Sequence, residues 1–137
     1  MIGILIVSHG AFGEALIRCA SHVLGKRPPR VGHVGVTMHD DPDAVLIRAR
    51  ELVSQLDEGD GVLVFTDILG ATPSNIASRL LRPGKIEGVS GVSLPMLIRA
   101  LTYRNEPLAA VVDKATSAAR ECTVHIDCES GNGPGQN

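Results

Sequence analysis

Short apolar runs alternate along the chain with longer segments in which apolar residues recur every three or four positions. The short runs are typical of strands buried on both faces, and the longer segments are typical of amphipathic helices. Strands are predicted at residues 2–7, 31–36, 62–65 and 89–92, with a last, edge strand at 123–127. Helices are predicted at residues 12–24, 42–56, 73–81, 93–103 and 107–121. This order predicts a parallel sheet with helices on both faces, which is a three-layer α/β domain.

Residues that favour helix caps mark where several of these helices begin and end. Gly25 suits the left-handed conformation that stops a helix. Asp41 before Pro42, and Thr72 before Pro73, have the pattern of an N-cap followed by proline in the first turn. We therefore expect the Thr72 hydroxyl to cap the third helix.

The length of 137 residues and the apolar fraction of 44% suffice for one domain whose core needs no disulfide or metal. No internal repeat or linker divides the chain. We expect a single domain over residues 1–127 and a flexible polar tail over residues 128–137, where glycine and polar side chains dominate.

Charge and aromatic content exclude several classes of binding protein. The formal net charge is only -2, and the aromatic residues are limited to Phe12, Phe65 and Tyr103. Proteins that bind nucleic acids need a basic surface, and those that bind single strands also need stacking platforms. We therefore expect no nucleic-acid partner and no dedicated sugar pocket.

The cysteines and the hydropathy of the chain bear on its cellular location. Cys19, Cys122 and Cys128 are odd in number and lack a close metal-ligand pair, so neither a disulfide framework nor a zinc site is predicted. No signal peptide and no membrane-spanning segment is apparent. We expect a cytoplasmic protein that does not insert into a membrane.

The candidate chemistry lies just after the strands, because ligands of open parallel sheets bind beyond the carboxyl ends of the strands. His9 follows the first strand, and Gly10 lets the backbone approach a ligand closely. Asp67 follows the third strand and, if the two strands are neighbours, can accept the Nδ1–H of His9. The Nε2 lone pair would then point outward, ready to attack phosphorus or to bind a metal. Alternatively, His9 is an ordinary turn residue and Asp67 a capping residue.

A loop of small residues, Gly70-Ala71-Thr72-Pro73-Ser74-Asn75, enters the third helix. Its backbone amides and the Thr72 hydroxyl are candidates to bind a phosphoryl group carried by His9. The chain lacks the glycine-rich motifs of nucleotide sites, so we expect no cofactor. His39, in the acidic loop before Asp41, is most simply a solvated loop residue.

Three segments resemble the IIA domains of the mannose family of the bacterial phosphotransferase system. Ile4-Leu5-Ile6-Val7-Ser8-His9-Gly10 is similar to the phosphorylation site of that family. The segment from Val64 to Asn75 is similar to its Asp-x-x-Gly-Gly/Ala-Ser/Thr-Pro-x-Asn stretch, and Gly91-Val92-Ser93-Leu94-Pro95-Met96-Leu97 to a third stretch. The segments occur in the order and at the spacing of the family, and the resemblance covers residues 1–126. Ser93 departs from the family, in which Asn is common.

The resemblance implies a parallel sheet in the order 2-1-3-4 with an added antiparallel strand, commonly exchanged in a homodimer. It implies that His9 accepts a phosphoryl group at Nε2 from the carrier protein HPr and passes it to a IIB protein or uses it as a regulatory signal. Asp67 would be the Nδ1 partner, with Gly10, Gly70, Ala71 and Thr72 near the phosphate.

The main alternative is a metal-binding α/β protein similar to the tetrapyrrole chelatases, which also place His-Gly after a first strand. In that case His9 would be a metal ligand, and His39 with Asp67 would have to complete a weak site. The sequence as a whole favours the phosphoryl-transfer interpretation, and we therefore assign no metal ligand.

Overall fold

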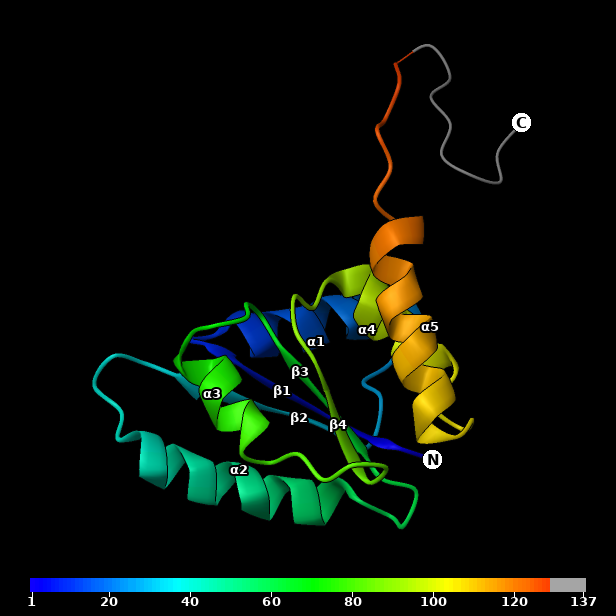
Figure 1. The fold of residues 1–137 in the computed structure, drawn as a ribbon. Coiled ribbons are helices and arrows are strands. Elements are labelled where there is room, and N and C mark those ends of the chain that lie inside the picture. Colours follow the sequence, from blue (N-terminus) through cyan, green and yellow to red (C-terminus); the bar gives the residue numbers. More distant parts are fainter. Residues whose placement is uncertain (129–137) are drawn as a thin grey trace.

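The structure is a computed structural model, and it describes residues 1–128 (Figure 1). Its elements in chain order are β1 (Gly3–His9), α1 (Phe12–Leu24), β2 (Val31–Val36), α2 (Pro42–Leu56), β3 (Val62–Thr66), α3 (Thr72–Ser78), β4 (Ile86–Val89), α4 (Leu94–Thr102) and α5 (Leu108–Glu121). The predicted polar tail lies outside the described residues except for residue 128. In the described part of the chain, no helix is both long and apolar enough to cross a bilayer.

The four strands form one parallel sheet in the order β2-β1-β3-β4, as expected. Helices α1, α4 and α5 cover one face, and α2 and α3 cover the other (Figure 1). The three-layer α/β fold predicted from the sequence is therefore confirmed. Since β1 is central, its last residue lies in the middle of the row of strand carboxyl ends, where ligands bind in such sheets.

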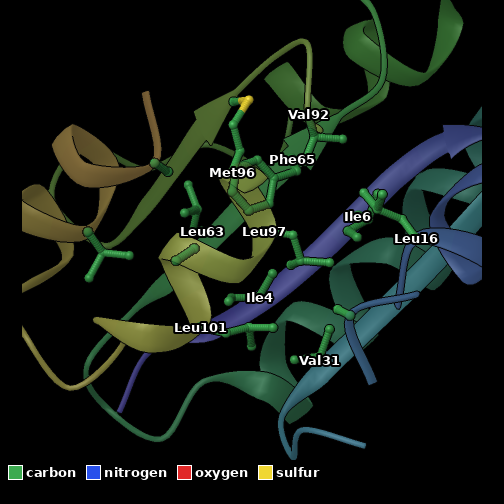
Figure 2. Packing of buried hydrophobic residues seen from close by; sticks show 14 of the residues in the cluster. Ile4, Ile6, Leu16, Val31, Leu63, Phe65, Val92, Met96, Leu97 and Leu101 are labelled. Atoms are coloured by element: carbon green, nitrogen blue, oxygen red, sulfur yellow. The ribbon is translucent and has the colours of Figure 1, made fainter. Parts of the chain in front are cut away.

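Alternation along the strands divides the core into two clusters on opposite faces of the sheet. Ile4 and Ile6 of β1 pack with α1, α4 and α5, whereas Leu5 and Val7 pack with α2 and α3. Figure 2 shows the first cluster, in which the side chains of Phe65 and other strand residues meet those of α4. The α4 residues Met96, Leu97 and Leu101 are buried there, as core positions should be.

A buried arginine organises the opposite end of the sheet, where the strands begin. Arg104 is 6% exposed. Its guanidinium donates hydrogen bonds to the carbonyl oxygens of Ile2, Pro29 and Arg30 at 2.6–3.1 Å. Burial lowers the pKa of this guanidinium, and the charge of Glu58 opposes that effect. Arginine nonetheless keeps its charge in proteins, so one cation joins the chain before β1 to the chain before β2.

Two helix predictions were confirmed at their caps. Gly25 has a left-handed φ of 80° after α1, and Asp41 accepts a hydrogen bond from the Asp43 N–H at the start of α2. The prediction for α3 was wrong at both ends. Ala71 occupies the N-cap position without a side-chain bond, and the helix ends at Ser78. The next residues bond to carbonyls three positions back, which tightens the chain into a turn.

The fourth strand lies three residues earlier than predicted, at Ile86–Val89. Gly91 has a φ of 75°, which turns the chain out of the extended conformation before Val92. The Val92 N–H then bonds the Thr66 carbonyl at 3.0 Å outside the strand ladder. The apolar pair Val89 and Val92 therefore spans a strand end and a turn rather than one strand.

The predicted antiparallel edge strand at residues 123–127 was wrong for the single chain. Within the described residues, this segment forms no ladder with the sheet. It leaves the end of α5 and extends away from the sheet (Figure 1). The alternating pattern of these residues specifies strand propensity, but a strand also needs an available partner edge.

Candidate functional site

The candidate site lies where β1 and β3 end side by side. Val7 of β1 pairs with Thr66 of β3 in the parallel register. The next residues on each strand therefore leave the sheet at the same edge, and the structure brings His9 and Asp67 together there. The proximity expected from the order of strands is present, although 58 positions separate the two residues along the chain.

One carboxylate holds both the backbone and the ring of His9. Oδ2 of Asp67 accepts the His9 backbone N–H at 2.9 Å and lies 2.8 Å from its Nδ1. The other oxygen, Oδ1, accepts the Ile68 N–H at 3.0 Å. An ionised carboxylate accepts hydrogen bonds but has no proton to donate. Nδ1 therefore carries the proton, and the lone pair of the neutral ring is on Nε2.

The charge state of Asp67 follows from two opposing effects. Partial burial raises the pKa of its carboxyl, but the hydrogen bonds from the His9 backbone and ring and the nearby ring charge outweigh burial and lower it. The carboxylate is therefore ionised throughout the neutral range, with only 13% of its side chain exposed. The His9 side chain is 53% exposed. The reactive ring is thus accessible, and the group that orients it is sheltered.

Two further residues shape the loop around His9, and sequence reasoning gave neither of them this role. Ser8 is fully buried, and its Oγ accepts the Gly13 N–H at 2.9 Å, which satisfies one free amide of the first turn of α1. A Cβ added to Gly35 of β2 would overlap the carbonyl oxygen of Gly10. Ser8 lies four positions before α1 and five before Gly13, so its bond does not follow the usual N-cap spacing, and the close approach at Gly35 has no signal in the sequence either.

We predict that Gly35→Ala lowers the free energy of unfolding by about 1–3 kcal/mol, because the added methyl group must displace backbone. It should also slow any reaction at His9, since Gly10 is the next residue. Gly32→Ala in the same strand is the matched control, because its methyl group would only make ordinary contacts with Leu56 and Leu5. Urea unfolding of both variants checks the prediction, and equal stabilities would contradict it.

The four residues predicted to surround a phosphoryl group differ in whether their backbone N–H groups already have a hydrogen-bond acceptor. The Gly10 N–H bonds the Val36 carbonyl at 2.9 Å, and the Gly70 N–H bonds the Ser74 Oγ at 3.0 Å. Their glycine conformations, with φ of 49° and 86°, serve the turns themselves. Ala71 and Thr72 follow at the start of α3, and within the described residues their N–H groups and the Thr72 hydroxyl have no hydrogen-bond acceptor or donor.

The loop after β2 adds a turn near the same edge but no metal site. The Asp40 carboxylate accepts the Thr37 N–H at 2.8 Å, and that bond lowers the pKa of Asp40. His39 is exposed beside it. Across residues 1–128, no three His, Cys, Asp or Glu side chains gather as a metal site would require. His9, Asp67 and His39 thus do not form the ligand set that the metal-binding alternative needs.

Comparison with solved structures places this fold among known proteins. The structure matches an EIIA component of the phosphotransferase system from Streptococcus agalactiae with a TM-score of 0.80 and 29% identity, covering 91% of this chain and 97% of that one. It matches a mannose/sorbose-specific IIA subunit from Enterococcus faecalis with a TM-score of 0.81 and 20% identity, covering 92% and 95%. The second likeness concerns the fold alone.

Two of the curated relatives differ in the kind of protein that they are named as. The mannose-specific EIIAB component of Escherichia coli K12 is 30% identical over 106 residues, which is 77% of this chain and 32% of that protein. The transcriptional regulatory protein LevR of Bacillus subtilis is 27% identical over 121 residues, 84% of this chain and 12% of that protein. The chain therefore spans about a third of the first relative and a smaller part of the second.

A family model settles the assignment. The model named EIIA-man, described as PTS system fructose IIA component, matches residues 3–116. That range contains His9, Asp67 and every strand of the sheet. The chain belongs to the EIIA-man family of the phosphotransferase system.

Proposed function

We propose that this chain is a phosphocarrier that accepts a phosphoryl group on Nε2 of His9 from phosphorylated HPr. The observation that carries the proposal is the 2.8 Å contact between His9 Nδ1 and Asp67 Oδ2, which leaves Nε2 unprotonated on an exposed ring. A fixed tautomer on an exposed ring is what a histidine nucleophile needs. Membership of the EIIA-man family supports the same role.

The proposed step is an in-line exchange of one N–P bond for another. The lone pair of His9 Nε2 attacks phosphorus, and the bond to the donor histidine breaks with its electron pair returning to the donor nitrogen. The His9 proton stays on Nδ1, so the phosphorylated ring is cationic and its charge faces the Asp67 carboxylate. Such transfers depend on positioning and on electrostatic stabilisation. The amides of Ala71 and Thr72 are available to the phosphoryl oxygens.

Exposed apolar side chains around His9 support a protein as the donor. Phe12 begins α1 just after the site, and Met38, which is 91% exposed, lies in the loop after β2. Ile68 and Leu69 follow Asp67, and Leu69 is 77% exposed. Apolar groups this exposed at the rim of a site are typical of surfaces that contact other proteins. We propose a cytoplasmic location, where HPr would meet this rim.

The acceptor of the phosphoryl group is either a IIB protein or a regulatory target. The relative from Escherichia coli is named as a mannose-specific EIIAB component, and the relative from Bacillus subtilis as a transcriptional regulatory protein. Both classes of acceptor are compatible with the same chemistry at His9. Incubation of the phosphorylated chain with a purified IIB protein distinguishes them by whether the phosphate moves.

The decisive experiment incubates the chain with phosphoenolpyruvate, enzyme I and HPr and measures phosphate incorporation. We expect a phosphate that is labile in acid and stable in base, as phosphohistidine is, and none in His9→Ala. His39→Ala is the matched control and should be labelled normally, because His39 is exposed and makes no contact with Asp67 in the described part of the chain. Absence of label in the wild type, or label that persists in His9→Ala, would overturn the proposal. Stoichiometric metal retained on purification and lost in His9→Ala would support the metal-binding alternative.

We further propose that the chain forms a homodimer in which residues 123–127 add a strand to β4 of a second copy. β4 is the last strand of the sheet, and within the described chain its outer edge pairs with no other strand apart from the single bridge between Arg82 and Ile86. Val124 and Ile126 are exposed in the segment that extends from α5. Pairing this segment with β4 would cover both an open edge and exposed apolar side chains.

The paired change Val124→Asp and Ile126→Asp should convert the dimer into a monomer, because charged carboxylates would be buried against β4. Light scattering should give about twice the chain mass of 14.4 kDa for the wild type and the single mass for the variant. Ile47→Asp on α2 is the control and should remain dimeric, since Ile47 is exposed in the other layer. A monomeric wild type would contradict the proposal.

A further inference from the structure

A cavity lined by three arginines lies at the end of the sheet where the strands begin, opposite to His9. Arg50 on α2, and Arg79 and Arg82 in the turn after α3, line a space of about 430 Å³ together with the start of β4 at Ile86. Sites for small molecules have volumes of roughly 300–1,000 Å³. None of the residues proposed to act in phosphoryl transfer lines this cavity.

The charges around the cavity are unbalanced in favour of cations. Within the described residues, the side chains of Arg50 and Arg82 have no ion pair or hydrogen bond. Arg79 has one contact, to the exposed Asp43 at 3.4 Å. Three exposed arginine residues line one cavity, so an anion bound there would meet cationic side chains from two segments of the fold.

Two features oppose an anion, and neither balances the arginines. Asp57 also lines the cavity, but its Oδ1 already accepts the N–H groups of Gly59 and Gly61 at 2.8 and 3.1 Å. The C-terminus of α2 adds about half a negative charge. Together with the Asp43 carboxylate that contacts Arg79, these leave a net charge of about +0.5 against three guanidinium charges.

We propose that this cavity binds a small polyanion, namely a molecule with two or more phosphoryl groups. Guanidinium groups bind phosphate oxygens through paired hydrogen bonds, and several of them suit a ligand with more than one phosphate. The Ser54 hydroxyl lies in the same lining and offers a neutral donor. Arg50 is far in the sequence from Arg79 and Arg82, which are three residues apart, so only the fold reveals that all three line one cavity.

The proposal is tested by titrating the full chain with inorganic tripolyphosphate in an isothermal calorimeter at physiological salt. We expect one site per chain, with the affinity at least about tenfold lower in the double variant Arg50→Gln and Arg82→Gln. The control double variant Arg18→Gln and Arg120→Gln removes the same charge from other exposed sites on α1 and α5. It should change the affinity less than about twofold. Circular dichroism and thermal unfolding verify that both variants are folded.

His9→Ala separates this proposal from the phosphocarrier function, because it should bind tripolyphosphate with unchanged affinity. Loss of binding in His9→Ala would place the anion at the phosphoryl-transfer site and overturn the proposal. Equal weakening in the two double variants would show general electrostatic attraction and also overturn it. No heat of binding at millimolar tripolyphosphate would overturn it as well, whatever the result of the phosphorylation experiment.

Discussion

Asp67→Asn should slow phosphoryl transfer from phosphorylated HPr about a hundredfold while leaving the chain folded. The amide oxygen of Asn can take the place of Oδ2 and accept the same two hydrogen bonds from His9. The negative charge is lost, however, and with it the stabilisation of the cationic ring formed during transfer. A loss of about 2.7 kcal/mol in the transition state corresponds to this factor. Rapid-quench measurement of the single-turnover rate checks it.

Asp40→Asn is the matched control, because it removes a carboxylate from a neighbouring loop that does not contact His9. Its transfer rate should stay within about twofold of the wild type. The ¹⁵N shifts of His9 should show Nδ1 protonated in the wild type and in Asp67→Asn. A slower rate in Asp67→Asn would then come from the lost charge and not from a change of tautomer. A rate for Asp67→Asn equal to that of the wild type would remove Asp67 from the mechanism.

Arg104→Met should lower the free energy of unfolding by about 3 kcal/mol. The carbonyl oxygens of Ile2, Pro29 and Arg30 would lose the guanidinium that binds them, and an unsatisfied buried polar group costs about 1–3 kcal/mol. The substitution also removes the free-energy cost of burying the guanidinium charge, which offsets part of that loss. The hydrogen bonds should dominate, because their acceptors are backbone groups that the variant cannot remove. Urea unfolding measures the change.

Arg27→Met provides the comparison, since Arg27 is exposed and the substitution is the same. It should change the free energy of unfolding by no more than about 0.5 kcal/mol. Arg104→Lys should fall between the two, because an ammonium group keeps the charge without the planar fork that reaches several carbonyls. A stability of Arg104→Met equal to that of Arg27→Met would show that the buried guanidinium contributes nothing to the fold.

The sequence predicted the sheet and most helices because their signals are local. The apolar run before His9 and the periodicity behind Asp41 each depend on residues close together in the chain. The contact between His9 and Asp67 was also predictable, since it follows from two strand ends and one assumption about neighbouring strands. The bond from the His9 backbone N–H to the Asp67 carboxylate could not be predicted, because residue types do not specify which oxygen accepts from which donor.

The errors arose where distant contacts or backbone conformation decide the outcome. Gly91 was included in the predicted fourth strand at residues 89–92, but its positive φ turns the chain out of the extended conformation there. Thr72 has the residue type of an N-cap, yet Ala71 occupies that position because the backbone of the preceding loop sets where the helix begins. Arg104 gave no signal at all, since its acceptors lie near residues 2 and 30.

The bond between His9 and Asp67 also joins the two halves of the molecule. The loop after His9 leads into α1 on one face of the sheet, and the loop after Asp67 leads into α3 on the other. A change that moves either of these loops relative to the other should therefore alter this bond. The proton resonance of the His9 Nδ1–H should then report by NMR on the relative position of the two loops, in any variant that keeps His9 and Asp67.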